Sequence, residues 1–585
     1  MIKVLFDTIK KHYSLFPNRV KKNFFLIQIL VITTSLVDLF GFVVFVPVFT
    51  IIFDPEILRS SSALMSVNVF FGNLPDNLFQ AYLLILSLMV FGLRSVFLVI
   101  SYRFQQSFSF KMSKYIGLKT LKYKMNLDYI NFQSQNQSEL NRELTINVFQ
   151  FSKFLITPVQ LLLSEIIIIL LIVTGIALYD IYSFFLVLIC LVPTSLLFYR
   201  FVKKKIKNLA KSINVLEPLL YENCLRAVYG FVDINLRNKE FKLYKDYKQI
   251  MDKIIRLKIK SNVYNILPAK FFELITVFGV VLLFIYSNLI VNNPVFGIKI
   301  LTIYIAASYK VLPSLSKIVP SLMLLEQYSY LFDVFKNPLH HQSDSNIKKN
   351  QLSSLGFETI ELRNIGFSYD DDVTLENINL KISKGETVGI IGDTGSGKTT
   401  LMNIISGLLI PNKGKLIADN IEINRKNITN WKLGVAYVPQ QPYLESGTLI
   451  QNIAFLEDHP NEKKVMNAIK MASLSEFISN GKIKNIKIKE FGKNLSVGQK
   501  QRIMIARALY NDCKLILFDE STSSLDNKTE NDIVNTNFQL KKNKVTVIIV
   551  AHRLSTLVHA DKIFKITNKT INKSYSYHEI LKSNN

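Results

Sequence analysis

The sequence has little cysteine and almost no tryptophan: three cysteines and one tryptophan occur in 585 residues. The cysteines are Cys190, Cys224 and Cys513, whose spacing fits no metal site, and none of them falls in a segment expected to face outward. This pattern argues against a disulfide framework and against a cysteine metal centre. The first residues also lack a short apolar core followed by a small-residue cleavage site, so we expect no cleaved signal peptide.

Acidic residues are scarce as well. The chain holds 44 Asp and Glu against 70 Lys and Arg, a formal net charge of +26, and its mean hydropathy is +0.24. The basic residues crowd between long apolar runs in the first 330 residues. This distribution is typical of a membrane protein rather than of a nucleic-acid-binding protein. We therefore expect membrane lipids, and no nucleic acid, among its partners.

Long apolar stretches are the main feature of the N-terminal half. A membrane-spanning helix needs about 20 mostly apolar residues. The first and last candidates are longer than one span requires, which predicts tilt or extension beyond the lipid. The six expected spans are residues 24–53, 79–101, 153–178, 181–202, 266–290 and 297–325.

The charge of the connecting segments predicts the orientation of these spans. Lys and Arg are frequent before the first span, after the second and after the fourth, whereas the other connections hold almost none besides Arg59. The positive-inside rule then predicts a chain that crosses the membrane several times with both termini in the cytoplasm. The two long basic connections have helical composition and would extend the spans by about 30–40 Å.

The segments outside the expected spans differ in composition and in the spacing of their apolar residues. Residues 2–16 place apolar side chains at helical spacing, which favours an amphipathic helix on the inner membrane surface; a disordered basic tail is the alternative. Residues 336–356 are polar and aperiodic, as expected of a linker. From residue 357 short β-branched runs alternate with helical stretches, which predicts an α/β domain with a largely parallel sheet. The fold class is therefore multi-domain: an all-α six-helix transmembrane domain at 1–335, followed by an α/β P-loop domain at 357–585.

One motif in the second domain predicts a phosphate-binding loop. Residues 392–399 match G-x-x-x-x-G-K-[ST] between an expected strand and an expected helix. Glycines let backbone N–H groups turn toward phosphate oxygens, and the helix N-terminus adds positive potential. Lys398 would meet the β- and γ-phosphates of ATP, and Thr399 would coordinate Mg²⁺. The residues expected to contact the nucleotide here are Gly392, Asp393, Thr394, Gly395, Ser396, Gly397, Lys398, Thr399 and Thr400.

A second acidic motif follows an apolar run. Residues 515–520 read Leu-Ile-Leu-Phe-Asp-Glu. In this context Asp519 is expected to hold the Mg²⁺ shell, and Glu520 is expected to act as the general base that polarises the attacking water. A strand that merely ends in an acidic turn is the alternative, and the matched phosphate loop upstream makes it less favourable.

The segment Leu495-Ser-Val-Gly-Gln499 resembles the signature of ATP-binding cassette (ABC) transporters. Further family motifs occur in the expected order along the C-terminal 230 residues. The resemblance implies that Tyr369 stacks on adenine, that Gln440 senses Mg²⁺ and the attacking water, and that His552 contacts the γ-phosphate. It also implies nucleotide contacts from Ser496, Gly498 and Gln499, and it matches residues 523–526 to the D-loop. The cofactors that the resemblance implies are ATP and Mg²⁺.

The signature departs from the commonest family form at Val497, where glycine is usual. Ser496 and Gly498 are present, so we expect an active site. In this family the signature of one domain completes the phosphate site of another, and this chain holds one such domain. The resemblance therefore implies a second copy of the chain, as a homodimer with two working sites. Six spans ahead of the nucleotide domain resemble the exporter type, an ATPase coupled to translocation.

Cations within the expected spans indicate what is transported. Lys299, Lys310 and Lys317 are spaced by 11 and 7 residues, which returns each to within about 20° of the previous one and forms one stripe about 27 Å long. Arg94 adds a cation in the second span. Intramembrane charges usually face a cavity or a partner, and this stripe suits an anionic amphipathic cargo. Pairing of these cations with Asp38, Glu165 or Glu273, or snorkelling to the surfaces, is the alternative.

The amino-acid sequence of residues 301–321 resembles the sixth span of bacterial flippases for polyprenyl-diphosphate-linked oligosaccharides. This narrower resemblance implies flipping of a lipid-linked oligosaccharide from the inner to the outer leaflet. Such flippases carry a small amphipathic element in the first outward loop, for which the candidates here are Ile57, Leu64, Val67 and Phe71. An exporter of hydrophobic drugs or of lipid A-like lipids is the main alternative. An ATP-gated channel or regulator shares every motif and is the alternative from another class.

Overall fold

The computed structural model describes residues 18–53, 69, 75–179, 181–286, 294–340, 353–370, 372–474, 486–519, 527–551 and 553–584. Several sequence predictions lie outside these residues: the amphipathic helix at 2–16, the weak amphipathic element of the first outward loop and most of the linker. The chain divides into two compact units. Unit 1 contains Met1–Leu127 and Ser134–Ser343, and unit 2 contains Asp128–Gln133 and Asp344–Asn585.

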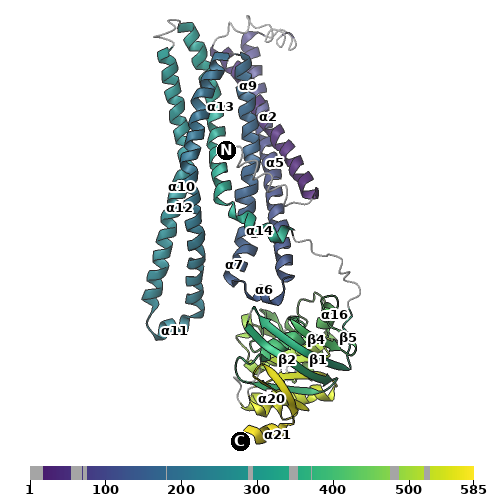
Figure 1. The fold of residues 1–585 in the computed structure, drawn as a ribbon. Helices are drawn as coiled ribbons and strands as arrows, with labels where there is room; N and C mark the ends of the chain where they lie inside the picture. Colours follow the sequence, from purple (N-terminus) through teal and green to yellow (C-terminus); the bar gives the residue numbers. More distant parts are fainter. Residues whose placement is uncertain are drawn as a thin grey trace. The chain divides into compact units, whose positions relative to one another are not determined.

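Unit 1 is built entirely of helices among its described residues (Figure 1). Several helices are far longer than a membrane is thick, because the basic connections continue the apolar spans without a break, as the sequence predicts. The described helices are α2 (Asn18–Phe53), α5 (Asp76–Met125), α7 (Gln137–Arg142), α8 (Val148–Phe151), α9 (Thr157–Tyr179), α10 (Ile181–Tyr229), α11 (Phe231–Leu236), α12 (Glu240–Tyr286), α13 (Pro294–Gln327) and α14 (Tyr330–His340). Helix α14 covers the start of the segment expected to be a linker.

Four stretches of the described residues are long and apolar enough to cross a membrane: Val20–Val37, Leu78–Met125, Gln137–Gly175 and Glu240–Leu282. They contain parts of four of the six expected spans. The other two expected spans lie on α10 and α13, where many side chains are outside the described part of the chain.

Two wide turns interrupt the helix that leads into α9. Residues Glu143–Asn147 and Ser152–Ile156 each form one π-helical turn, in which the backbone bond spans one residue more than in an α-helix. The second turn redirects the carbonyl of Ser152, which accepts a 3.1 Å hydrogen bond from Ser109 of α5 and a 3.2 Å bond from Thr157. The hydroxyl of Ser113 donates to that of Ser152 at 2.7 Å. These bonds fix the wide turn against α5.

The core of unit 1 is aromatic where α5, α8, α9 and α14 meet. Phe151 is fully buried, and its ring makes edge contacts with Phe332 at 5.5 Å and Phe335 at 5.6 Å between centroids. This geometry is one that aromatic pairs prefer. A second, smaller cluster joins α10, α12 and α13 around Phe272.

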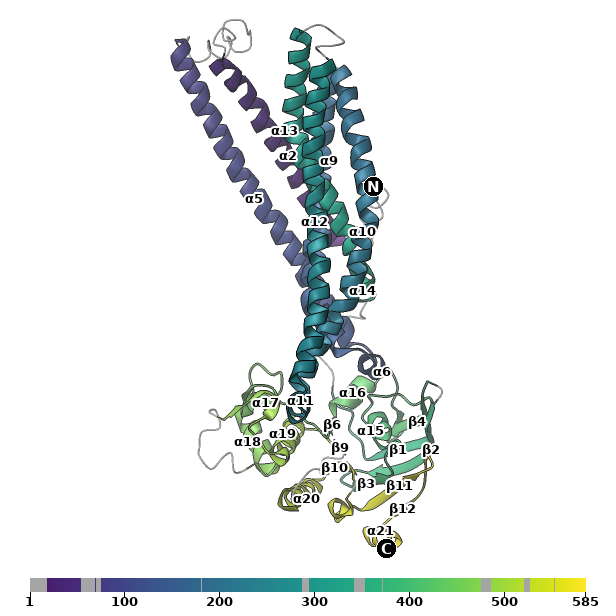
Figure 2. The same cartoon turned by 90° about the vertical axis from the view of Figure 1, so that its left-hand side faces the viewer.

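Unit 2 is an α/β domain with two main sheets (Figure 2). The larger has the order β12-β11-β3-β10-β9-β6, and all neighbours pair in parallel except the edge strand β12. The smaller is antiparallel, in the order β2-β1-β4-β5. The strands are β1 (Thr359–Tyr369), β2 (Asp372–Ser383), β3 (Thr387–Gly392), β4 (Lys413–Ala418), β5 (Ile421–Glu422), β6 (Val435–Val438), β7 (Gly447–Thr448), β8 (Lys487–Ile488), β9 (Leu515–Asp519), β10 (Thr546–Val550), β11 (Lys562–Thr567) and β12 (Thr570–Tyr575).

Helices cover this sheet and form a smaller helical part beside it. The strands β3, β9 and β10 are buried along almost their whole length, as expected of a parallel sheet covered on both faces. The described helices of unit 2 are α6 (Tyr129–Gln133), α15 (Lys398–Ile405), α16 (Ile428–Leu433), α17 (Leu449–Ile453), α18 (Glu462–Met471), α19 (Val497–Tyr510), α20 (Asn527–Lys542) and α21 (Tyr577–Asn584).

Candidate functional site

The parallel register gathers the predicted nucleotide residues at one edge of the large sheet. Val550 at the end of β10 pairs with Ile390 of β3 on one side and with Asp519 of β9 on the other, and Val438 of β6 pairs with Phe518. The carboxyl ends of four strands therefore meet there, which is where open α/β sheets bind ligands. Glu520, residues 523–526 and His552 lie outside the described residues, but each follows one of these strands in the sequence.

The loop after β3 has the backbone geometry of a phosphate cradle. Gly395 and Gly397 have φ angles of +83° and +96°, a left-handed region that favours glycine. A Cβ at Gly397 would lie 2.7 Å from Cδ2 of Leu375 and 3.0 Å from the carbonyl oxygen of Thr374, whereas a Cβ at Gly395 would meet nothing within 4 Å. Gly397 is therefore pressed against β2, and Gly395 lies at the open side of the loop.

Lys398 holds the loop in shape. The side chain is buried, and its ammonium donates hydrogen bonds of 2.9 Å to the carbonyl of Gly392 and 3.0 Å to that of Asp393. Helix α15 begins at Lys398, so its N-terminal N–H groups face the loop. The hydroxyl oxygen of Ser396 is buried and has no hydrogen-bond partner among the described residues. A buried polar atom without a partner, beside a helix N-terminus, fits the bound phosphates of a nucleotide.

Asp519 is fixed by a residue that the sequence did not single out. The hydroxyl of Tyr437, on β6, donates a 2.6 Å hydrogen bond to Oδ2 of Asp519 at the end of β9. Gln440 follows β6 at the same edge of the large sheet and is exposed. Thr399 is also exposed, in the first turn of α15. A carboxylate, a hydroxyl and an amide oxygen are hard ligands that suit Mg²⁺. An aromatic residue in a short strand carries no sequence signal for this contact, because the parallel register alone brings its hydroxyl to Asp519.

The predicted adenine-stacking residue lies on the hairpin that packs on the loop. Tyr369 ends β1 and pairs with Asp372 of β2, and its ring contacts that of Phe367 edge-on at 5.0 Å. The same strand β2 supplies Leu375 against Gly397. The hairpin therefore positions an aromatic face on the element that borders the phosphate loop.

The signature residues form a helix N-cap. Ser496 caps α19: its hydroxyl accepts a 3.2 Å bond from the N–H of Gln499, and the Gln499 side chain accepts a 3.0 Å bond from the N–H of Ser496. This reciprocal capping box leaves Ser496 exposed at a helix N-terminus. Val497 is 38% exposed, and Gly498 is buried. Helices α19 and α15 lie on either side of strands β6 and β9 in Figure 2.

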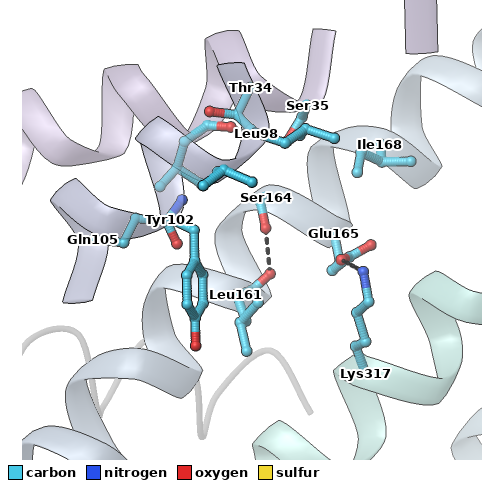
Figure 3. Close-up of a pocket in the computed structure, with 12 residues that line it drawn as sticks. Thr34, Ser35, Leu98, Tyr102, Gln105, Leu161, Ser164, Glu165, Ile168 and Lys317 are labelled. Atoms are coloured by element: carbon cyan, nitrogen blue, oxygen red, sulfur yellow. Dashed lines mark hydrogen bonds and ion pairs between the residues drawn. The ribbon is translucent and has the colours of Figure 1, made fainter. Parts of the chain in front are cut away.

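Unit 1 contains a separate cavity of about 380 Å³ among α2, α5, α9 and α13 (Figure 3). Lys317 is one of its lining residues, and its ammonium lies 2.6 Å from Oε1 of Glu165. Of the alternatives left open by the sequence, the structure thus gives Lys317 a carboxylate partner. Glu273 instead pairs with Lys270 at 2.8 Å.

Arg94, a further predicted cargo residue, is not brought together with Lys317 in the described structure. Arg94 is half-buried on α5, with its guanidinium carbon 5.0 Å from the centroid of the Phe91 ring, and it does not line the cavity. Lys299 and Lys310 belong to α13, but their side chains, like that of Asp38, are outside the described part.

Comparison with known proteins identifies the type of domain. Residues 375–523 match the family profile described as "ABC transporter". The chain is 34% identical over 252 residues to the alpha-hemolysin translocation ATP-binding protein HlyB of Escherichia coli O157:H7, a match that covers 43% of this chain and 35% of that protein. It is 37% identical over 225 residues to the ATP-dependent lipid A-core flippase of Syntrophus aciditrophicus (strain SB), covering 38% of this chain and 37% of the flippase. The chain thus spans about a third of the length of these curated relatives.

The similarity in fold extends over almost the whole chain. A solved structure described as that of a bacterial Atm1-family ABC exporter with ATP bound superposes with a TM-score of 0.74 at 19% identity, covering 97% of each chain. The likeness includes both the helical unit and the α/β unit. The chain therefore contains an ABC transporter domain, and its fold is that of an ABC exporter, in which a helical membrane region is followed by the nucleotide-binding domain.

Proposed function

We propose that this protein is an ATP-driven exporter that uses ATP hydrolysis in unit 2 to move an amphipathic molecule through unit 1. The observation that carries the proposal is the phosphate loop, whose left-handed glycines, buried lysine and helix N-terminus fit nucleotide phosphates. The domains are residues 1–335 for the membrane part, 336–356 for the linker and 357–585 for the ATPase. The protein crosses a bacterial inner membrane with both termini in the cytoplasm.

Each residue of the nucleotide site has its own part in the chemistry. Lys398 and the N–H groups of the loop hold phosphate charge, and Tyr369 stacks on adenine. Glu520 acts as general base, and His552 contacts the γ-phosphate. The side chains of Thr399, Gln440 and Asp519 would hold Mg²⁺, which would supply positive charge to offset the charge that develops on the phosphates.

The working unit is a homodimer in which Ser496, Gly498 and Gln499 of one copy complete the phosphate site of the other. Supporting this, Ser496 stands exposed at the N-terminus of a 14-residue helix, where N–H groups favour an anion. Mixed dimers of Lys398→Ala and Ser496→Ala chains test it. One site then carries both changes and the other carries neither, so mixed dimers should hydrolyse ATP faster than either pure variant. Equal background activity in all three would contradict shared sites.

The cargo we propose is a lipid-linked oligosaccharide, flipped from the inner to the outer leaflet. The resemblance of residues 301–321 to polyprenyl-diphosphate oligosaccharide flippases supports it, as do Lys299 and Lys310 of the same expected span, whose charge suits a phosphate-bearing cargo. A lipid A-like lipid is the second candidate, favoured by the similarity to a lipid A-core flippase; hydrophobic drugs are a third, and an ATP-gated channel or regulator is the candidate of another class.

Transport by purified protein in liposomes separates these candidates. Labelled lipid-linked sugar, lipid A, a drug dye and simple ions would be offered in turn with Mg²⁺-ATP, and protein carrying Glu520→Gln would serve as the ATPase-deficient control. We expect ATP-dependent flipping of the lipid-linked sugar. Movement of ions alone would contradict the exporter proposal, and movement of dye or lipid A without the sugar lipid would contradict the cargo.

A further inference from the structure

The cavity among α2, α5, α9 and α13 is large enough for a small-molecule group and is lined by both polar and apolar side chains. Its volume, about 380 Å³, is within the range of about 300–1,000 Å³ found for small-molecule sites. Figure 3 shows side chains from α2, α5, α9 and α13 converging on it. The lining residues are Val31, Thr34, Ser35, Leu98, Val99, Tyr102, Gln105, Leu161, Ser164, Glu165, Ile168 and Lys317.

Three hydroxyl groups at this cavity, those of Thr34, Ser35 and Ser164, present oxygen rather than hydrogen. Thr34 donates to the carbonyl of Leu30 at 2.6 Å, Ser35 to that of Val31 at 3.0 Å, and Ser164 to that of Leu161 at 2.8 Å. Each hydroxyl has one proton and two lone pairs. Because the protons are used within the helices, the three oxygens are left as acceptors for a ligand that donates hydrogen bonds.

The charged residues of the lining neutralise each other. The Glu165 side chain is only 5% exposed, and Lys317, 55% exposed, covers it at 2.6 Å. An anion placed at Lys317 would also lie beside the Glu165 carboxylate, so repulsion offsets attraction. A cation placed at Glu165 would have to displace Lys317. An uncharged group is not repelled by Glu165 and does not have to displace Lys317. The Lys317 ammonium has three N–H donors, so it can donate a hydrogen bond to such a group while it stays paired with Glu165.

Apart from the Gln105 amide, which can both donate and accept hydrogen bonds, the rest of the lining is apolar or amphipathic. Val31, Leu98, Val99 and Ile168 supply aliphatic wall, and Tyr102, which is 62% exposed, supplies a ring. A wall of this kind suits the C–H faces of a sugar ring, whose hydroxyls would donate to the oxygens described above.

We propose that this cavity binds an uncharged, hydroxyl-rich head group, such as a sugar unit of an amphipathic cargo. The inference rests on the proposed export function for its role, but binding itself requires no ATP. It assigns the contact to sugar hydroxyls and removes Lys317 from the residues that would bind a cargo phosphate.

The test measures binding of three amphiphiles with the same alkyl chain to the full-length protein in lipid nanodiscs without nucleotide. Octyl glucoside, octyl phosphate and octylamine, all below their micellar concentrations, differ only in head group, and saturation-transfer NMR reports weak affinities. We expect octyl glucoside to bind tightest. Tighter binding of the phosphate, lost in Lys317→Gln, would overturn the proposal in favour of an anion site. Tighter binding of the amine, lost in Glu165→Gln, would overturn it in favour of a cation site.

Two matched pairs of hydroxyl deletions locate the site. Thr34→Val with Ser164→Ala removes one lining hydroxyl from α2 and one from α9. Thr33→Val with Thr174→Val removes exposed hydroxyls of the same two helices, which donate to Leu30 and Leu170 but do not line the cavity. The first pair should weaken octyl glucoside binding about 10-fold, through two lost hydrogen bonds, and the second should change it less than twofold.

Equal effects of the two pairs would overturn the proposal. Size-exclusion profiles and melting temperatures identical to those of the parent are required for both pairs, and Ser35→Ala alone provides a second lining variant if the first pair does not fold. The outcome is separable from that of the proposed function. Sugar binding without ATP-driven flipping would contradict the export proposal but not the cavity assignment. ATP-driven flipping with unaltered sugar affinity in the lining variants would contradict the cavity assignment but not the export proposal.

Discussion

The hydroxyl of Tyr437 lies 2.6 Å from Oδ2 of Asp519 and donates a hydrogen bond to it. The bond links β6, which leads to Gln440, with β9, which leads to Glu520. A group that orients a metal-binding carboxylate from behind commonly changes metal affinity by about 10–100-fold when it is removed. Tyr437 is therefore a positioning residue for the proposed Mg²⁺ site.

Tyr437→Phe should raise the Mg²⁺ concentration required for half-maximal ATPase activity about 10-fold, because Asp519 loses its orienting bond. Excess Mg²⁺ should restore the maximal rate. Fluorescent-ATP binding in EDTA should be unchanged, whereas the Mg²⁺-dependent gain in nucleotide affinity should shift in parallel with activity. Tyr443→Phe, whose side chain is 54% exposed, is the control. A lower maximal rate with an unaltered Mg²⁺ requirement would show that Tyr437 acts only through packing.

Gly397→Ala should impair nucleotide binding far more than Gly395→Ala. Both substitutions force alanine into a left-handed conformation, which costs about 1–2 kcal/mol, but only at Gly397 does the new methyl meet Leu375 at 2.7 Å. The difference between the two variants thus isolates the contact with β2. The measurement is the increase in melting temperature on adding ATP, which reflects affinity. Equal increases in the two variants would contradict the close approach seen here.

Lys398→Ala should weaken ATP binding itself, because the loop loses its internal hydrogen bonds to Gly392 and Asp393 as well as a phosphate contact. Glu520→Gln should leave binding intact and reduce turnover at least about 100-fold, since the amide retains the shape of the side chain but cannot accept a proton. Equilibrium binding and steady-state turnover, measured on the same samples, separate the two effects. If Glu520→Gln hydrolyses ATP at nearly the parent rate, another residue is the base.

Lys124→Met should destabilise unit 1 by about 3–5 kcal/mol. The Lys124 ammonium lies 2.7 Å from Glu143, the two side chains are only 10% and 12% exposed, and the lysine also donates to Gln135 at 3.0 Å. Removing it leaves the Glu143 carboxylate buried without its cation. Lys122→Met, an exposed position two residues away, is the control.

Thermal unfolding of the full-length protein in detergent would reveal this difference. Adding Glu143→Met to Lys124→Met should recover most of the lost stability, because two apolar residues replace an ion pair at little cost. A single variant as stable as Lys122→Met would mean that water reaches Glu143.

The sequence was sufficient for those parts of the fold that depend on local pattern. The phosphate loop was predictable because its glycines and lysine have fixed spacing between a strand and a helix. The helical continuation of α5 and α10 was predictable because their basic segments hold few glycines and prolines. Each of these inferences uses neighbours along the chain.

Contacts that depend on packing were not predictable in the same way. Asp38, Glu165 and Glu273 were equivalent partners for the lysines of α13 until the rotation of each helix was known, and the structure pairs Glu165 with Lys317. Tyr437 gave no signal, because its role depends on the neighbouring strand in the sheet. The crowding of Gly397 by Leu375 depends on how β2 folds over the loop.

The wide turn at Ser152–Ile156 has a consequence for how this helix tolerates a change in chain length. A π-helical turn holds one residue more than an α-helical turn, so losing one residue there would convert it to ordinary helix and leave the flanking faces in phase. Losing one residue between Leu161 and Glu165 would instead rotate the N-terminal part of the helix by about 100° relative to its C-terminal part. Glu165 and the aromatic core around Phe151 could then no longer both keep their partners. Between Phe151 and Glu165, the wide turn is therefore the one place where the helix can lose a residue without a rotation. A deletion there would keep Glu165 facing Lys317.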